Sequence, residues 1–427
     1  MPGPAARALA SYGSPYHGGV EAPAQSGHAR CRYPAILVLA LVLLGCTPAT
    51  PDASTDTSEV PASQPASASA TAESSATPAE AAEPILQALE YLPIGARVFE
   101  FTDWVSVKAS LGVPELTSAA PDDERETFAR SLSAVGASDT PFTFIDQRGF
   151  VFKTLLTTWG FDNLDLDWEA SIHDSSGIAY ALRLRDGFDL APVLARLDER
   201  GFATSVIEGV TVRTHEMANE DWVFAGDFAF LNVALMPDGR TLVVSRLPEA
   251  LELVLARRGQ LLGPDAPPVV LDAVAALEHP SGAFLGFVLD ALCDPAGPNA
   301  QPIVQELLAD VGPLHAYTLV AVGYRADLDP AGRIVFGYVD PADATADVDG
   351  RRRLATEGLS LQFGEPIRNR LFSVVDAIVE EGSLILRVGP PVIESPQPGV
   401  APPTVPSFLL RMTSRYDMIF AACDFSL

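Results

Sequence analysis

Alternating apolar and polar positions in the middle of the chain predict strands separated by short helices. Residues 177–185 (GIAYALRLR) alternate with a period of two and are rich in β-forming residues, which predicts a strand. The apolar spacing after Asp189 predicts a helix that ends at Gly201, and strand patterns follow on both sides of the turn at Glu208-Gly209. This part of the chain therefore has a β-α-β-β order.

The following residues extend the same kind of pattern. Residues 228–245 predict two strands joined at Pro237-Asp238-Gly239. Pro248 is suited to the first position of a helix, and the apolar residues after it fall on one helical face. A Pro-rich stretch at 263–268 then separates this part of the chain from a second patterned part.

The second part partly repeats the order of the first. It predicts strands at 317–324 and 333–339, a helix from Pro341 to about Gly358, and strands at 372–379 and 383–388. The expected fold is α+β, with antiparallel sheets, helices packed on one face, and two related β-α-β-β halves. We expect the halves at 85–262 and 270–427. Because residue identity between them is slight, a chance similarity of pattern stays open.

A different pattern occupies the N-terminal region. Residues 35–44 form an apolar run of ten residues, preceded by Arg30 and Arg32. The run has the length of a signal-peptide core and is too short to cross a bilayer. It ends in Leu43-Leu44-Gly45-Cys46, and in this feature the chain resembles bacterial lipoproteins.

The resemblance implies that residues 1–45 are a signal peptide removed after Gly45. Cys46 would then carry a thioether-linked diacylglycerol, and a fatty acid such as palmitate would acylate the new amino group. Two or three such chains make a stable membrane anchor. Thr47 after the cysteine implies the outer membrane if the host has two membranes. An ordinary signal peptide, in which Cys46 has no special role, is the alternative.

Residues 46–84 contain the lipidated cysteine and a predicted disordered tether. From residue 47 onward, Ala, Ser, Thr, Pro, Asp and Glu make up nearly all of this segment, which has no aromatic or basic residue. Such a composition cannot form an apolar core. As a flexible coil it would span about 35 Å, enough to hold a domain away from lipid headgroups.

Charge narrows the possible partners. The chain has 55 acidic and 28 basic residues, a net charge of -27. Nucleic-acid binding requires a basic surface, so we expect no nucleic-acid partner. Contact with the membrane is expected through the lipid on Cys46, with a further envelope partner that the sequence does not identify.

The cysteines suggest one disulfide. Cys31 would leave with the signal peptide and Cys46 would bear lipid, so the exported domain keeps Cys293 and Cys423. Outside the cytoplasm such a pair tends to be oxidised. Two separate buried thiols are the alternative.

Residues with catalytic or metal-binding chemistry are scattered. The exported part contains no GxSxG, SxxK, HExxH, Walker A or GxGxxG motif, and we predict no catalytic residue, no metal site and no cofactor. His173, His215, His279 and His315 are isolated in sequence, and structural or surface roles are expected for them.

An acidic cluster and two aromatic groups are the other candidates. Asp165, Asp167 and Glu169 should share one face of a strand, where a solvated surface is favoured over calcium binding. The aromatic residues predicted to belong to the core rather than to a ligand wall are Phe99, Phe101, Trp104, Trp159 and Phe161.

These observations favour a lipid-anchored protein of the cell envelope, with a domain that binds a partner or acts as a scaffold. A non-catalytic domain is favoured over an enzyme. One alternative is an envelope hydrolase that uses dispersed groups such as His215 and the acids at 162–169. Another is a solute-binding lipoprotein, although these usually have two doubly wound α/β lobes, whereas hairpins dominate this sequence.

Overall fold

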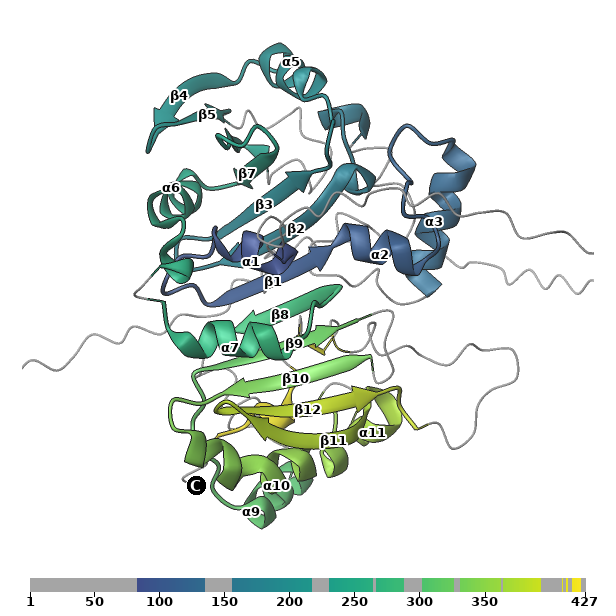
Figure 1. The fold of residues 1–427 in the computed structure, drawn as a ribbon, viewed down its shortest axis with the longest axis vertical. Helices are drawn as coiled ribbons and strands as arrows, with labels where there is room; N and C mark the ends of the chain where they lie inside the picture. Colours follow the sequence, from purple (N-terminus) through teal and green to yellow (C-terminus); the bar gives the residue numbers. More distant parts are fainter. Residues whose placement is uncertain are drawn as a thin grey trace, which may run out of the picture. The chain divides into compact units, whose positions relative to one another are not determined.

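The described part of the chain forms one antiparallel sheet of 12 strands with helices packed against it (Figure 1). The computed structural model describes residues 83–134, 156–216, 230–263, 266–287, 302–325, 331–361, 364–392, 409, 412–413 and 417–423. All of them belong to one compact unit that extends from Ser75 to Leu427. The fold is α+β, as predicted.

Every neighbouring pair of strands in this sheet is antiparallel. The strands are β1 (Val98–Asp103), β2 (Leu166–His173), β3 (Ile178–Leu184), β4 (Ala203–Ile207), β5 (Val210–Thr214), β6 (Asn232–Leu235), β7 (Thr241–Ser245), β8 (Gly282–Gly286), β9 (Leu319–Tyr324), β10 (Gly332–Gly337), β11 (Ser373–Glu380) and β12 (Ser383–Gly389). Their order across the sheet is β11-β12-β10-β9-β8-β1-β2-β3-β7-β6-β5-β4.

Helices lie in the connections between the strands and pack against the sheet. The α-helices are α1 (Pro84–Leu89), α2 (Trp104–Ser110), α3 (Asp122–Ala134), α5 (Ala191–Glu199), α6 (Pro248–Arg257), α7 (Pro268–Ala276), α9 (Pro302–Val311), α10 (Pro341–Glu357) and α11 (Ile367–Arg370). The short 3-10 helices are η2 (Asn163–Asp165), η4 (Gln260–Leu262) and η6 (Ile419–Ala421).

Strand order repeats on the two sides of the central β1–β8 pair. On one side β1, β2 and β3 are followed in the sheet by β7 and β6, and on the other side β8, β9 and β10 are followed by β12 and β11. In the chain, α10 and the short α11 come before β11–β12, whereas α5 is followed first by the β4–β5 hairpin and then by β6–β7. The sequence pattern matched β4–β5 with β11–β12, whereas in the sheet β6–β7 takes the equivalent place. Burial explains this arrangement, because β7 is buried at all five positions while β4 is almost entirely exposed and lies at the edge.

One turn and the starts of two helices follow directly from the residues at those positions. Glu208 and Gly209 both have positive φ values, 50° and 75°, as the two-residue turn between β4 and β5 requires. Pro248 and Pro341 begin α6 and α10, where a missing backbone N–H costs nothing. The Asp340 side chain accepts a hydrogen bond from the N–H of Ala342 and so caps α10.

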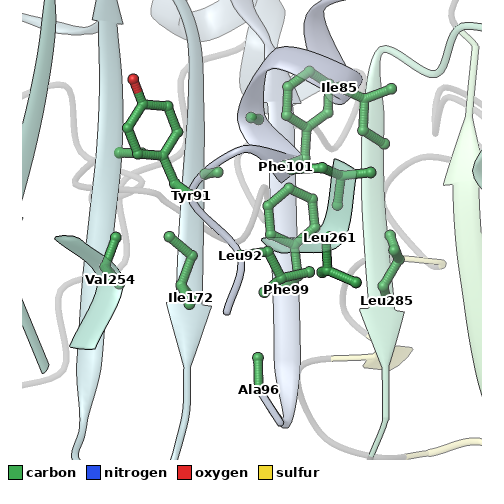
Figure 2. Close-up of a cluster of buried hydrophobic side chains, with 14 of the residues drawn as sticks. Ile85, Tyr91, Leu92, Ala96, Phe99, Phe101, Ile172, Val254, Leu261 and Leu285 are labelled. Atoms are coloured by element: carbon green, nitrogen blue, oxygen red, sulfur yellow. The ribbon is translucent and has the colours of Figure 1, made fainter. Parts of the chain in front are cut away.

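Helices cover both faces of the sheet, so the prediction that they pack on one face is wrong. The first face carries one continuous apolar core that includes Phe99 and Phe101 of β1 and is covered by α1, α6 and α7 (Figure 2). Ile85 of α1 and Val254 of α6 point into this core. Along β9, Leu319 contributes to this core and its neighbour Val320 to the opposite face. Strands that are apolar on both faces need a layer on each side.

The second face carries two apolar cores. One lies over the first half and includes residues of α2, α3 and α5, among them Trp104, Phe128 and Leu197. The other lies over the second half and includes residues of α10, α11 and η6, among them Leu354 and Ile419. Unlike the first face, this face therefore has a break in its apolar surface near the middle of the sheet.

Candidate functional site

Polar residues of β1 and β2 lie on the second face, in this central break. We call them the polar seam: Glu100, Thr102, Glu169, Ser171 and His173. Strand register pairs Glu100 with Ser171 and Thr102 with Glu169. Leu182 of β3 is the partner of Glu169 on one side, and Phe284 of β8 is the partner of Glu100 on the other. The seam thus lies between the two second-face cores.

Three members of the polar seam contact one another. Ser171 Oγ donates a hydrogen bond of 2.7 Å to Glu100 Oε2 and lies 3.1 Å from Nε2 of His173. The same Nε2 is 3.4 Å from Glu100 Oε2. Glu100 and Ser171 are buried, whereas 32% of the His173 side chain is exposed. The seam is therefore closed at its centre and reaches solvent at His173.

This arrangement differs from a hydrolytic triad. In a triad the histidine contacts the serine with one ring nitrogen and the acid with the other, so that the acid orients the imidazole. Here Glu100 and Ser171 both contact Nε2, and the serine proton points to the carboxylate. The geometry holds Ser171 as a hydrogen-bond donor and does not present it as a nucleophile.

Glu169 is the most deeply buried carboxyl of the polar seam. Its Oε2 accepts a hydrogen bond of 3.2 Å from Asn163 Nδ2. Complete burial raises the pKa of Glu169 well above its usual range, and the indole of Trp104 opposes this only in part. A raised pKa of this kind favours the protonated form of Glu169, which can donate as well as accept a hydrogen bond.

The acidic cluster predicted to be a solvated face is instead divided among different partners. Asp165 is fully buried beside Arg185, with 3.3 Å between Asp165 Oδ1 and Arg185 Nε. Asp167 pairs with Arg240 at 2.6 Å, and a register irregularity of β2 at this point separates it from Glu169. Among the described residues, no group of three or more His, Cys, Asp or Glu side chains is arranged to hold a metal ion. The predicted strand face therefore does not form.

Asp162 forms another internal ion pair. Arg125 of α3 donates to it at 2.8 Å, and both side chains are buried. Lys108 of α2 is also buried and donates a hydrogen bond of 2.9 Å to the carbonyl of Leu164, and desolvation lowers the pKa of its ammonium group. These contacts join α2, α3 and η2 and identify the acidic segment as a structural junction.

A second buried polar cluster surrounds Arg351 of α10. Its guanidinium contacts Asp347 and the hydroxyl of Tyr338, and it donates to the backbone carbonyls of Phe420 and Ala422. Residues 417–423 are thereby joined to α10. The guanidinium also lies over two rings, with its central carbon 4.8 Å from the Phe336 centroid and 5.0 Å from the Tyr317 centroid.

The isolated histidines have separate environments. The ring of His215 packs against Phe202, with 5.1 Å between the centroids, and none of the described contacts joins it to the acids at 162–169. His279 is largely exposed and contacts Glu83 at 3.2 Å. His315 Nδ1 lies 2.7 Å from Asp347 Oδ1, and this hydrogen bond raises the histidine pKa. The hydrolase alternative built on His215 gains no geometric support from these contacts.

The cysteine predictions fall mostly outside the described residues. Cys46 and Cys293 both lie there, together with the signal peptide and all of the predicted tether except its last two residues; of these, Glu83 precedes α1 and Pro84 begins it. Cys423 is described and is buried. The lipid anchor and the Cys293–Cys423 bridge stay predictions.

Aromatic residues behave as the sequence predicted. Phe99 and Phe101 belong to the first-face core, and Trp104, Trp159 and Phe161 belong to a second-face core.

A hollow of about 250 Å³ lies beside the second-face core that contains Trp104, between the end of α2 and α3. Its lining consists of Leu111, Val113, Leu116, Asp123, Glu124, Thr127, Phe128 and Ser131. It is separate from the polar seam.

Sequence reasoning missed Glu100, Ser171 and the cluster around Arg351. Glu100 and Ser171 occupy alternate positions of strands whose other positions are apolar, a pattern that by itself indicates a face toward water. The signal that argues otherwise is the run of apolar residues on both faces of β9, which requires a second covering layer. Arg351 lies within a run of three arginines, and its neighbours are not buried.

Comparison with known proteins identifies no family for this chain. No family model matches it, and no curated protein does. Among solved structures, crystal form III of TP0453 matches with 10% sequence identity and a TM-score of 0.33, covering 70% of this chain and 92% of that one. A likeness at this level carries no argument about fold or function. None of the described helices has both the length and the apolar composition needed to cross a membrane.

Proposed function

We propose that the protein is a lipid-anchored component of the bacterial cell envelope, attached through Cys46. The observation that carries the proposal is the sequence Leu43-Leu44-Gly45-Cys46 at the end of an apolar run of signal-peptide length. The segment that follows has the composition of a solvated tether. The α+β domain is then held at a distance from the membrane by the lipid and the tether.

We further propose that this domain is a non-catalytic binding or scaffold domain. Its buried charged groups are engaged in internal contacts, such as Arg351 with Asp347 and Arg125 with Asp162. The solute-binding alternative is less well supported, because its two parallel α/β lobes differ from the single antiparallel sheet of the described residues. The net charge of residues 85–427, with 48 acidic and 25 basic residues, favours a basic partner surface.

Membrane fractionation of cysteine variants tests the anchor. The full chain would be produced in a two-membrane bacterium as wild type, as Cys46→Ser and as the matched control Cys31→Ser. The lipid anchor predicts that wild type and Cys31→Ser stay with membranes through a high-salt wash and leave only with detergent. Cys46→Ser should lose this behaviour. A Cys46→Ser variant that remains in the washed membranes as completely as wild type would refute the anchor.

The hydrolase alternative is kept because Ser171, His173 and Glu100 are in mutual contact. A fluorophosphonate probe labels activated serines, and we expect no Ser171-dependent labelling because the Ser171 proton is committed to Glu100. Ser106→Ala, at a serine whose Oγ lies 2.7 Å from that of Ser281, is the control for Ser171→Ala. Labelling that disappears in Ser171→Ala alone would overturn the non-catalytic part of the proposal.

A further inference from the structure

One end of the polar seam contains buried polar atoms without a hydrogen-bond partner. These atoms are Thr102 Oγ1, Glu169 Oε1, Trp104 Nε1 and Tyr324 Oη. Each of the four residues is at least 97% buried. A buried polar atom that makes no hydrogen bond costs about 1 to 3 kcal/mol, so folded proteins contain few of them and rarely several together.

Strand register brings these atoms to one place. Thr102 of β1 is directly paired with Glu169 of β2, and on its other side with Gly282 of β8. Gly282 is in turn paired with Tyr324 of β9. Directly paired residues of an antiparallel sheet point to the same face with Cβ atoms about 5 Å apart. All four positions therefore form one row across the second face.

Gly282 lets the tyrosine reach across this row. A Cβ atom at position 282 would lie 2.5 Å from Cε1 and 3.2 Å from Cζ of Tyr324, so the ring occupies the space above the glycine. Cζ, the ring carbon that carries the hydroxyl group, therefore lies over Gly282 of β8, the strand between Tyr324 and Thr102. The burial of this hydroxyl raises the pKa of Tyr324, and the charge of Asp103, the residue after Thr102, adds to this rise.

Trp104 is the fourth residue of the group and comes from a helix rather than from a strand. It is the first residue of α2 and follows β1 directly. Its indole N–H interacts with the Glu169 carboxyl closely enough to oppose the rise in the pKa of that carboxyl, although neither Trp104 Nε1 nor Glu169 Oε1 reaches the geometry of a full hydrogen bond. Both groups therefore keep unused hydrogen-bonding capacity.

We propose that Thr102, Trp104, Glu169 and Tyr324 form an internal binding site for ordered water. The set contains one obligatory donor, the indole N–H, two hydroxyl groups that donate and accept, and a carboxyl oxygen without a hydrogen-bond partner. Water matches this set because it both donates and accepts, and buried water typically makes about three such bonds. The site lies between the two second-face cores and joins them through hydrogen bonds. It is independent of the lipid anchor.

Two nearly isosteric substitutions test the site through the sign of their effect on stability. Tyr324→Phe and Thr102→Val each remove one hydroxyl and change little else. If the hydroxyls are bonded to internal water, each variant should lower the folding equilibrium constant roughly 5- to 10-fold, the usual effect of losing one hydrogen bond. If the hydroxyls have no hydrogen-bond partner at all, removing one also removes the cost of burying it, and the folding equilibrium constant should stay the same or rise.

A matched control separates this effect from the loss of any buried hydroxyl. Ser383 Oγ is also buried without a partner, and the other such atom of its strand, Arg387 Nε, is four residues further along β12. We expect Ser383→Ala to leave the folding constant unchanged or higher. Urea unfolding of the full chain followed by tryptophan fluorescence gives all three values. An unchanged or higher constant for either Tyr324→Phe or Thr102→Val overturns the water site.

Nuclear magnetic resonance provides a second readout that does not depend on stability. In the full chain with 15N-labelled tryptophan, the indole N–H signal of Trp104, assigned with Trp104→Phe, should show a nuclear Overhauser effect to a long-lived water molecule. Trp168, whose Nε1 donates a hydrogen bond of 3.3 Å to Gln87 Oε1, provides the comparison signal. The absence of a water contact at Trp104 also overturns the proposal.

Discussion

Arg351 and Asp347, one turn apart on α10, form an ion pair of 3.4 Å that is shielded from solvent. A buried pair of this kind is stabilising only while both partners and their additional hydrogen bonds are present, because either charge alone would be buried without compensation. The carbonyls of Phe420 and Ala422 are among those additional partners. One guanidinium group therefore links α10 to residues 417–423, beside the Tyr317 hydroxyl, which donates to the carbonyl of Ala421.

Replacing Arg351 tests this link. We expect Arg351→Met to lower the free energy of unfolding by about 3 to 5 kcal/mol, since it leaves the Asp347 carboxylate buried with less compensation. Urea unfolding provides the measurement. The adjacent Arg352 is the control: its side chain is 56% exposed and pairs with Asp349, so Arg352→Met should change the free energy by no more than about 1 kcal/mol. Equal effects of the two substitutions would contradict the role of Arg351.

The pH dependence of stability should carry a contribution from His315. Its hydrogen bond with Asp347 raises the histidine pKa in the folded protein above the ordinary value of 6.5. A raised histidine pKa contributes stability that is complete below pH 6.5 and is lost as the pH rises through the folded value. In His315→Gln the free energy of unfolding should therefore decrease less between pH 6 and 9 than in wild type. An equal decrease in both proteins would refute the contribution of His315.

Glu169 should also make stability fall as the pH rises, starting at a lower pH than His315. Burial raises its pKa well above 4.5, so the folded protein keeps the proton that the unfolded chain releases. Stability therefore falls as the pH rises above about 4.5, by up to about 1.4 kcal/mol per pH unit from this group, until the folded pKa is passed. We expect Glu169→Gln to remove this slope and to be more stable than wild type at pH 7.5. A Gln variant with the wild-type pH profile would show that Glu169 is charged in the folded protein.

The Cys293–Cys423 bridge is tested by alkylation. Denatured, unreduced protein treated with iodoacetamide should show no modification at either cysteine by mass spectrometry, and modification at both after reduction. Denaturation is needed because Cys423 is buried. Closing a loop of this length could contribute on the order of 5 kcal/mol in the chain-entropy account. Full labelling of both residues without reductant would exclude the bridge.

Local features of the fold could be predicted from the sequence because they depend on few residues. The turn at Glu208-Gly209 requires two positive φ values, and the helix of 341–357 begins at a proline, whose missing N–H would have no helical partner at this position. Each prediction used neighbours in the sequence. The structure confirms them within a residue or two.

Long-range pairing could not be predicted in the same way. The central strands β1 and β8 begin at Val98 and Gly282, and nothing near either strand specifies the other. Pairing of β7 rather than β5 with β3 depends on the relative burial of two hairpins, which is a property of the assembled sheet. The number of helical layers was missed for a related reason: alternation shows which face a residue occupies but not whether that face is covered.

The polar seam was missed because its polar residues follow the pattern of an exposed face. Glu100 lies between Phe99 and Phe101 and would face water in a sheet with one covered side. With helices on both sides, the same position becomes buried and needs a partner, which Ser171 supplies. Candidate sites of this kind become visible only when the second layer is known.

The most direct test of the proposed function is the mass of the N-terminal peptide of the mature protein. After expression of the full chain in a bacterial host and extraction with detergent, mass spectrometry of the purified protein should find a peptide that begins at Cys46 and carries a diacylglycerol, with a further acyl chain on its amino group. A peptide that contains an unmodified Cys46 joined to Gly45, or a mature terminus at any other residue, would contradict the lipid anchor and with it the proposed place of this protein in the envelope.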